Sequence, residues 1–208
     1  MNNIDRNAVM SIGYGLYVLT AHEGTKDNGC IVNVVAQLTD NPMRMLITVN
    51  KNNLTHDMIL NTRQFNVSLL TEETPMHVIK HFGFQSGRDM NKFEKCDAVK
   101  RAENGIYYIP KYTNAYISGK VTETTDLGTH TLFIAEITEA VKLGDAPSLT
   151  YAYYQKNIKP SAAKTDSDKG VTRWVCNVCG YVYEGENIPD DFICPWCKHG
   201  KEDFSIQN

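Results

Sequence analysis

Short runs of β-branched and aromatic residues, bounded by turn residues, make up most of the first 155 positions of the chain. The runs are Gly15–Ala21, Cys30–Thr39, Met45–Val49, Phe65–Leu70, Tyr116–Thr124 and Thr131–Val141. Runs of this length and composition predict β-strands. Because no strand–helix alternation accompanies them, a doubly wound fold is disfavoured, and a mainly β domain that forms a β-barrel is predicted.

Two short helices are expected between these strands. Thr55 is placed to cap a helix over Asp57–Arg63, since threonine is a common N-cap residue. Thr74 followed by Pro75 is typical of a helix start and predicts a second helix through Phe82.

The regular pattern stops after residue 155. Residues 156–171 lack apolar periodicity and are rich in Ser, Lys and Asp, which predicts a flexible linker between a domain at 1–155 and a tail at 172–208. The first domain has no nucleotide-binding glycine motif, because Gly13-Tyr-Gly15 is followed by Leu-Tyr-Val. A Rossmann site is therefore excluded.

The tail carries two C-x-x-C pairs, Cys176/Cys179 and Cys194/Cys197. Two residues between thiolates let one tight turn aim both sulfurs at one ion, and two such turns complete a tetrahedral site for zinc or iron. A disulfide framework is disfavoured because the chain has no other feature of a secreted protein.

The residues around these cysteines resemble a rubredoxin. Trp174–Tyr183 contains C-x-x-C-G-Y-x-Y, Ile188–Cys197 contains P-D-D-F-I-C-P-W-C, and Phe204 adds a further aromatic residue. The resemblance implies a rubredoxin-like domain at 172–208 with one iron bound by four thiolates, and zinc is the alternative. So short a domain is expected to need the metal for part of its stability.

Four segments of the first domain, taken in order, are similar to the flavin reductase-like family, which has an FMN-binding split β-barrel. They are residues 28–42, 49–58, 86–93 and 128–133. Such a barrel followed by a rubredoxin resembles the high-molecular-weight rubredoxins. This resemblance implies electron transfer from NAD(P)H through FMN to the iron, and then to a flavodiiron oxygen or nitric oxide reductase.

The resemblance also implies residues for the FMN site. The dianionic phosphate needs cations, for which Lys51 and Lys92 are the candidates and Arg88 is the reserve. Asn50 and Thr55 supply neutral donors, and Thr55 at a helix start also brings free backbone amides.

The flavin ring is expected to lie against a different segment. Asn33, Val35, Ala36 and Gln37 match the family segment whose backbone and side chains contact the ring. His130 matches a histidine that family members place beside the flavin. Without the resemblance, a histidine in a strand would be interpreted as structural.

Four further residues with reactive side chains have no role in this hypothesis. Cys30 and Cys96 are interpreted as small buried hydrophobic residues. His77 and His81 lie four apart on the predicted second helix, but no third ligand is evident nearby, so packing or surface roles are preferred to a metal site.

The distribution of charged residues differs between the first domain and the tail. Three of the 21 basic and six of the 24 acidic residues lie in the tail, so residues 1–170 hold 18 of each and the net charge of −3 belongs to the tail. An acidic surface near a redox site steers basic partners, although simple solvation explains the acidic surface equally well.

Scattered basic residues disfavour nucleic-acid binding. No apolar run would span a membrane, and with no signal-peptide pattern and with thiols committed to metal, a cytoplasmic protein is expected.

A homodimer is expected, because split barrels of the family complete each flavin pocket from a second subunit. The eleven tyrosines give indirect support, since a domain of this size would not bury them all and tyrosine favours interfaces. They include Tyr107, Tyr108, Tyr112, Tyr151, Tyr153 and Tyr154.

Three functions remain open at this stage. The first is an NAD(P)H-dependent electron-transfer enzyme, in which flavin converts a two-electron hydride into single electrons for the iron. The second is a flavin reductase that supplies reduced FMN to a partner and carries a structural zinc tail. The third is a non-enzymatic binding protein. The sequence does not separate NADH from NADPH.

Overall fold

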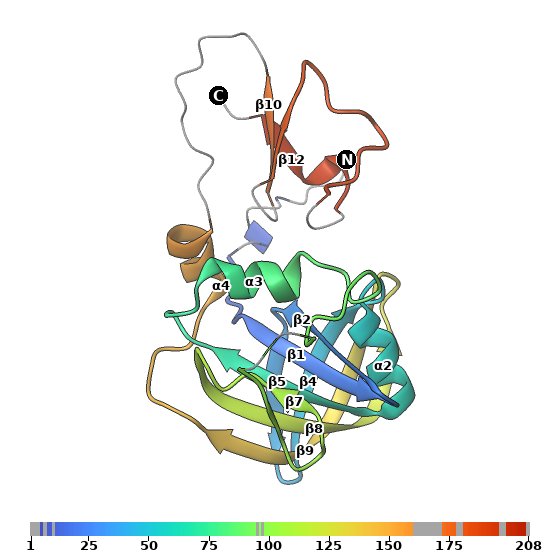
Figure 1. Ribbon diagram of the computed structural model, residues 1–208, viewed down its shortest axis with the longest axis vertical. Helices are drawn as coiled ribbons and strands as arrows, with labels where there is room; N and C mark the ends of the chain where they lie inside the picture. Colours follow the sequence, from blue (N-terminus) through green and yellow to red (C-terminus); the bar gives the residue numbers. More distant parts are fainter. Residues whose placement is uncertain are drawn as a thin grey trace.

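Figure 1 shows the computed structural model, in which a β-barrel carries a small three-stranded module at one end. The structure describes residues 5, 8–9, 11–94, 96, 98–159, 172–177, 181–195 and 199–206. We call residues 11–159 the barrel domain and residues 172–206 the C-terminal module. Among the described residues, no helix has the length and apolar character needed to span a membrane.

One antiparallel sheet of seven strands forms the barrel. Its strands are β1 (Tyr17–Glu23), β2 (Lys26–Val32), β3 (Val35–Asp40), β4 (Met43–Asn50), β5 (Gln64–Leu70), β8 (Thr113–Asp126) and β9 (His130–Lys142). Their order is β2-β1-β5-β8-β9-β4-β3. A separate short hairpin joins β6 (Lys100–Arg101) to β7 (Tyr107–Tyr108). The mainly β prediction is confirmed.

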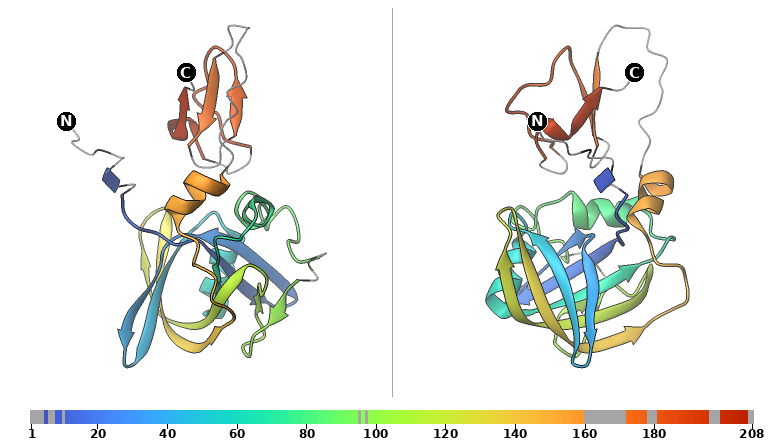
Figure 2. Two further views of the ribbon diagram at one scale, coloured as in Figure 1. Left: turned by 90° about the vertical axis from the view of Figure 1, so that its left-hand side faces the viewer. Right: turned by 180° about the vertical axis from the view of Figure 1, so that it is seen from behind.

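The two edge strands show where the barrel is split. β2 and β3 stand at opposite edges of the sheet, yet only Asn33 and Val34 separate them along the chain. The sheet must therefore curl until its edges approach each other, as Figure 2 shows. The prediction of a single strand over Cys30–Thr39 was wrong, because the chain passes here from one edge of the sheet to the other.

Alternating side chains fill the barrel interior. Met45, Ile47 and Val49 of β4 point inward and are buried, whereas the residues between them are half-buried. Phe65 has no exposed surface, and its ring lies against Gly119 of β8, where a Cβ atom would be 2.4 Å from the ring. A glycine is needed at this position so that the aromatic ring can occupy the core.

Two helices cover openings of the barrel. α2 (Leu54–Thr62) and α3 (Met76–Gly83) match the two predicted helices. Their caps differ from the prediction, since Asn53 and Pro75 occupy the N-cap positions and neither makes a side-chain cap hydrogen bond. Thr55 does not cap α2, because it lies inside the helix with its hydroxyl buried.

The barrel domain ends in α4 (Tyr151–Tyr153) and a π-helical turn (Tyr154–Ile158). Regular structure therefore extends into the first positions of the predicted linker. The rest of that linker, from residue 160 to 171, lies outside the described residues.

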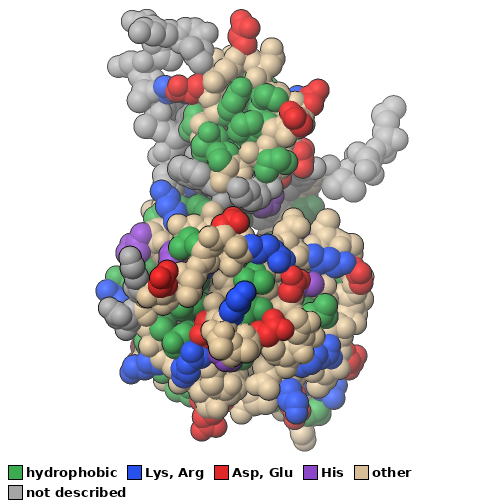
Figure 3. Space-filling view, turned by 45° about the vertical axis from the view of Figure 1, so that its right-hand side comes forward, with side chains coloured by type: hydrophobic (Ala, Val, Ile, Leu, Met, Phe, Trp, Pro, Cys, Tyr) green, Lys and Arg blue, Asp and Glu red, His purple; other side chains and the backbone are tan. Residues whose placement is uncertain are grey.

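The C-terminal module is a three-stranded sheet with a short 3₁₀ turn. β11 (Val182–Glu184), β10 (Arg173–Cys176) and β12 (Phe204–Ile206) lie in this order, and the 3₁₀ turn spans Lys201–Asp203. The sheet covers a small apolar cluster. Figure 3 shows hydrophobic side chains at the surface of the module with acidic side chains around them.

Candidate functional site

The two described cysteines of the C-x-x-C pairs lie together in the module. Cys176 and Cys194 are fully buried in one apolar cluster, and neither forms a disulfide. Cys179 and Cys197 lie outside the described residues. Two buried, unbridged thiols in a dry cluster fit a metal site, because thiolates there need a cation to offset their desolvation.

The two cysteines also begin turns of the same design. The backbone N–H of Cys176 donates to the carbonyl oxygen of Tyr181, and that of Cys194 donates to the carbonyl oxygen of His199, each with an N···O distance of 2.8 Å. In the sequence, the second cysteine of each pair falls between the two residues that this bond joins. Two matching turns suit four thiolates around one ion.

Aromatic rings form a wall beside these cysteines. The ring centroid of Phe192 lies 4.8 Å from that of Tyr183 and 5.4 Å from that of Phe204. Such a wall excludes water, and solvent access is one of the factors that set the potential of an iron–thiolate site.

Three of the predicted flavin residues lie together where β4 ends and β9 begins. Asn50 is the register partner of His130, and the backbone N–H of Lys51 donates to the carbonyl oxygen of Thr129 at 3.0 Å. The turn into β9 contains Gly128 with a φ of +83°, which favours glycine. We call Asn50, Lys51 and His130 the β4–β9 edge.

Two of the three predicted phosphate cations are paired with carboxylates at the surface, where Lys51 is half-buried and Arg88 is exposed. Lys51 Nζ lies 2.6 Å from Asp126 Oδ1, and Arg88 Nη2 lies 2.6 Å from Asp57 Oδ2. Lys51 lowers the pKa of Asp126, and His56 and Arg88 lower the pKa of Asp57 through hydrogen bonds. Exposed pairs of this kind contribute little to stability, so an incoming phosphate can compete for the cations.

The third cation is directed into the protein. Lys92 is only 3% exposed, and its Nζ donates to the carbonyl oxygens of Gly29 at 2.8 Å and Phe82 at 2.9 Å. Burial lowers the pKa of Lys92 to about 8. Cys30 is also buried, as predicted, and desolvation raises the pKa of its thiol.

Thr55 faces the same interior region. Its Oγ1 accepts a hydrogen bond from Asn28 Nδ2 at 3.0 Å, and both residues are buried. Gly87 packs closely there, since a Cβ atom on it would lie 2.2 Å from Asn28 Oδ1. The structure therefore places Thr55 and Lys92 where the loop at 84–94 meets β2.

The predicted ring segment lies beside the β4–β9 edge. Asn33 connects β2 to β3, and Val35 pairs with Ile47 of β4. Ala36 and Gln37 are exposed on the edge strand β3. The structure thus brings the ring segment and the edge onto neighbouring strands.

His56 is a residue that the sequence analysis missed. It is 5% exposed, its Nδ1 lies 2.9 Å from Asp57 Oδ1, and its Nε2 lies 2.8 Å from Thr131 Oγ1. Together with Arg88 it forms a hydrogen-bonded chain from the loop at 84–94 to β9. The available signal was a histidine and an aspartate in the first turn of an otherwise apolar helix.

His81 and Cys96 are the remaining candidate residues. His81 Nε2 lies 2.7 Å from the carbonyl oxygen of Lys92, and no group of three metal-binding side chains occurs among the described residues. Cys96 is only partly buried, so the prediction of a buried residue was wrong for Cys96.

Both parts of the chain are similar to known protein families. Residues 9–162 match the family "Flavin reductase like domain", and residues 174–205 match "Rubrerythrin, rubredoxin-like domain". A high molecular weight rubredoxin of Moorella thermoacetica is 35% identical, with 97% of this chain and 99% of that protein covered. A ferric-chelate reductase (NAD(P)H) of Archaeoglobus fulgidus is 39% identical, with 78% and 95% covered.

Solved structures support the fold of the barrel domain. An NADH:FAD oxidoreductase of Streptomyces globisporus C-1027 superposes with a TM-score of 0.63 at 21% identity, covering 70% of this chain and 85% of that one. The domain organisation and the cofactor pair, FMN and one iron, follow from the two matched families. The chain belongs to the flavin reductase-like family, in the form that carries a C-terminal rubredoxin-like domain, as the high-molecular-weight rubredoxins do.

Proposed function

We propose that this oxidoreductase takes electrons from NAD(P)H at FMN in the barrel domain and passes them through the iron of the C-terminal module to a protein acceptor. The observation that carries the proposal is the pairing, in one chain, of the β4–β9 edge with a module that buries two unbridged cysteines. FMN supplies the conversion of a two-electron hydride into single electrons, and a rubredoxin iron accepts one electron at a time.

Different residues bind the phosphate and the ring of FMN in this proposal. Lys51 and Arg88 bind the phosphate, since their carboxylate partners are exposed and can be replaced. Asn50 and His130 meet the ring, together with the segment Asn33–Gln37. Thr55 does not contact FMN directly but stabilises the site through its buried hydrogen bond with Asn28.

Lys92 stabilises the loop at 84–94 from inside rather than reaching the phosphate. Its ammonium group joins that loop to β2 and α3 through two carbonyl oxygens. The loop in turn carries Arg88, so the position of this cation depends on the buried lysine.

A homodimer belongs to the proposal. β3 is an edge strand whose residues are exposed from Ala36 to Asp40, and Leu38 is 43% and the adjacent Met43 47% exposed. An exposed edge strand with apolar side chains is suited to cover by a second chain. Because this strand follows the ring segment, a second subunit there would also complete the flavin site.

The acceptor is expected to be a flavodiiron protein in the cytoplasm. Of the described charged residues of the module, six are acidic and two are basic, so an acceptor with a basic docking face is favoured. A reducing compartment keeps the metal-binding thiols available.

The test is acceptor reduction by the FMN- and iron-loaded chain and by the Cys194→Ser variant. We expect both proteins to reduce their flavin with NADH or NADPH at similar rates, and only the intact chain to reduce a flavodiiron acceptor efficiently. Equal acceptor reduction by both proteins would contradict the proposal. In that case the chain would act as a flavin reductase, and a zinc-only module in iron-replete cells would point the same way.

A further inference from the structure

The C-terminal module contacts the barrel domain through one aromatic side chain. Phe84, the C-cap residue of α3, packs against the apolar cluster that contains Cys176 and Cys194. It is half-buried, and it is the barrel residue in that cluster among the described residues. The module therefore meets the barrel with the side that holds the two described cysteines.

Lys159, at the end of the barrel domain, reaches the same side of the module. Its Nζ donates to the carbonyl oxygen of Asn177, the residue after Cys176, at 2.5 Å. The contact thus involves both α3 and the turn that follows α4.

Phe84 also begins the loop at 84–94, which carries Arg88. Arg88 pairs with Asp57 in the first turn of α2, the helix that follows β4. The module therefore contacts the start of a loop that leads to the predicted flavin site.

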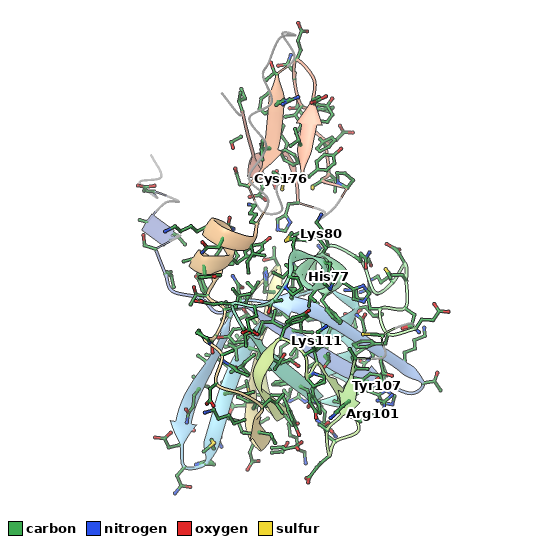
Figure 4. The ribbon with its side chains drawn as sticks, turned by 60° about the vertical axis from the view of Figure 1, so that its left-hand side comes forward. His77, Lys80, Arg101, Tyr107, Lys111 and Cys176 are labelled. Atoms are coloured by element: carbon green, nitrogen blue, oxygen red, sulfur yellow. The ribbon has the colours of Figure 1, made fainter. Side chains whose placement is uncertain are left out.

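Charge favours the same arrangement. Figure 4 shows Cys176 at the end of the module that faces α3, with Lys80 and His77 of that helix beneath it. The module is acidic, and a tetrathiolate iron site adds further negative charge. A helix face carrying Lys80 and His77 is complementary to it.

We infer that the C-terminal end of α3, with Phe84 as its anchor, and the turn ending at Lys159 form an intrachain docking surface for the module, and that the docked state is the one in which electrons pass from flavin to iron. This inference rests on the proposed function. With FMN and iron bound, each passage would move one electron from reduced flavin to ferric iron, which would become ferrous. The protein acceptor would reoxidise the iron between passages, and two passages would return the flavin to its oxidised form with its proton released to water.

Phe84 is a positioning residue in this account, because it holds the module and takes no part in the redox chemistry. Its place is fixed by the barrel: the Phe84 backbone N–H donates to the carbonyl oxygen of Lys80, and Phe82 two residues earlier is held by Lys92. Loss of the side chain should leave both cofactor sites formed but release the module.

The experiment compares Phe84→Ala with Phe84→Leu and with Leu60→Ala in the full, FMN- and iron-loaded chain. Leu60 is 44% exposed on α2 and serves as a matched apolar control. Anaerobic stopped-flow mixing with NADH follows flavin bleaching and then bleaching of the iron–thiolate band. Hydrogen exchange of the segment at 76–84 reports docking independently of activity.

We expect Phe84→Ala to slow flavin-to-iron transfer by about tenfold or more, because small losses of position cost this much. Flavin reduction should stay within about twofold, exchange at 76–84 should rise, and Phe84→Leu and Leu60→Ala should behave almost like the native chain. Unchanged transfer and unchanged exchange in Phe84→Ala would overturn the docking surface. If the native chain itself never reduced its iron, the proposed function would fail instead.

Discussion

The barrel domain and the C-terminal module are held together by different means. The barrel buries large side chains completely, among them Phe65 and Phe133. The described buried cluster of the module consists of Cys176, Ile188, Cys194 and Phe204. A core so small does not stabilise a domain alone, whereas a bound metal contributes directly to folding. One chain therefore combines a domain stable through apolar burial with a domain stable through its ion.

Removing one thiolate is the strongest test of whether the two domains are stabilised by different means. Cys194→Ser should abolish the iron spectrum and unfold the module, since structural metals in small domains contribute on the order of 10 kcal/mol. Both tryptophans, Trp174 and Trp196, lie in the tail, so their fluorescence reports the module. FMN fluorescence and far-ultraviolet circular dichroism report the barrel, and its melting temperature should be unchanged. A parallel loss of the barrel would show that the two domains fold as one unit.

The second test weakens the apolar core of the barrel and leaves the metal site unchanged. Phe65→Ala should lower the free energy of unfolding of the barrel by about 3–5 kcal/mol, because it leaves a cavity where Phe65 packs on Gly119. Denaturant titration measures this value. The iron–thiolate absorbance should persist beyond the barrel transition, and Leu60→Ala on the surface should cost less than about 1 kcal/mol. Simultaneous loss of iron and barrel structure would contradict independent stabilisation.

Lys92 allows a pH test of the barrel interior. Burial lowers its pKa from 10.5 to about 8, so between these pH values the unfolded chain binds more protons than the folded chain. The free energy of unfolding should therefore rise with pH across this range, by about 3 kcal/mol in total. Lys92→Met lacks this dependence, and the difference between the two proteins isolates the lysine from other titrating groups such as Cys30. Parallel pH profiles for the two proteins would mean that Lys92 is solvated in the native state.

The smallest expected effect concerns the exposed pair at the β4–β9 edge. Asp126→Asn releases Lys51 from its carboxylate partner, and it should tighten FMN binding by about two- to fivefold with no change in stability. Lys51→Met should weaken binding by about tenfold or more, since a charge-assisted bond to phosphate is lost. Flavin fluorescence titration measures both. Equal affinities for the native chain and both variants would remove Lys51 from the phosphate site.

Local patterns made most of the fold predictable. Most strands of the barrel follow from runs of β-branched and aromatic residues between turn residues. Both helices were predicted from residues near their starts, although their N-caps are Asn53 and Pro75. The two cysteine turns are encoded within a few positions each. The division of Cys30–Thr39 into two strands was not predictable, because neither Gly nor Pro marks Asn33 and Val34, and only closure of the sheet separates them.

The candidate site was predictable to a lesser degree, because the direction of a side chain depends on packing between distant segments. Lys92 and Arg88 lie in one loop with similar local sequence, but Lys92 turns inward to the carbonyl oxygen of Gly29 and Arg88 outward to Asp57. His56 was missed because its partner Thr131 is 75 residues away. Local sequence thus indicates the segments of the candidate site but not which of their side chains face the solvent.

The order of reduction in a single turnover tests the central claim most directly. The oxidised chain, loaded with FMN and iron, is mixed without oxygen with one equivalent of NADH or NADPH, and both cofactor spectra are followed. The account predicts that flavin absorbance falls first, and that the iron–thiolate band then bleaches at a rate independent of protein concentration. Flavin absorbance recovers only in part, because the single iron takes one of the two electrons. Iron that stays ferric while flavin remains reduced would contradict a relay from flavin to iron within the chain.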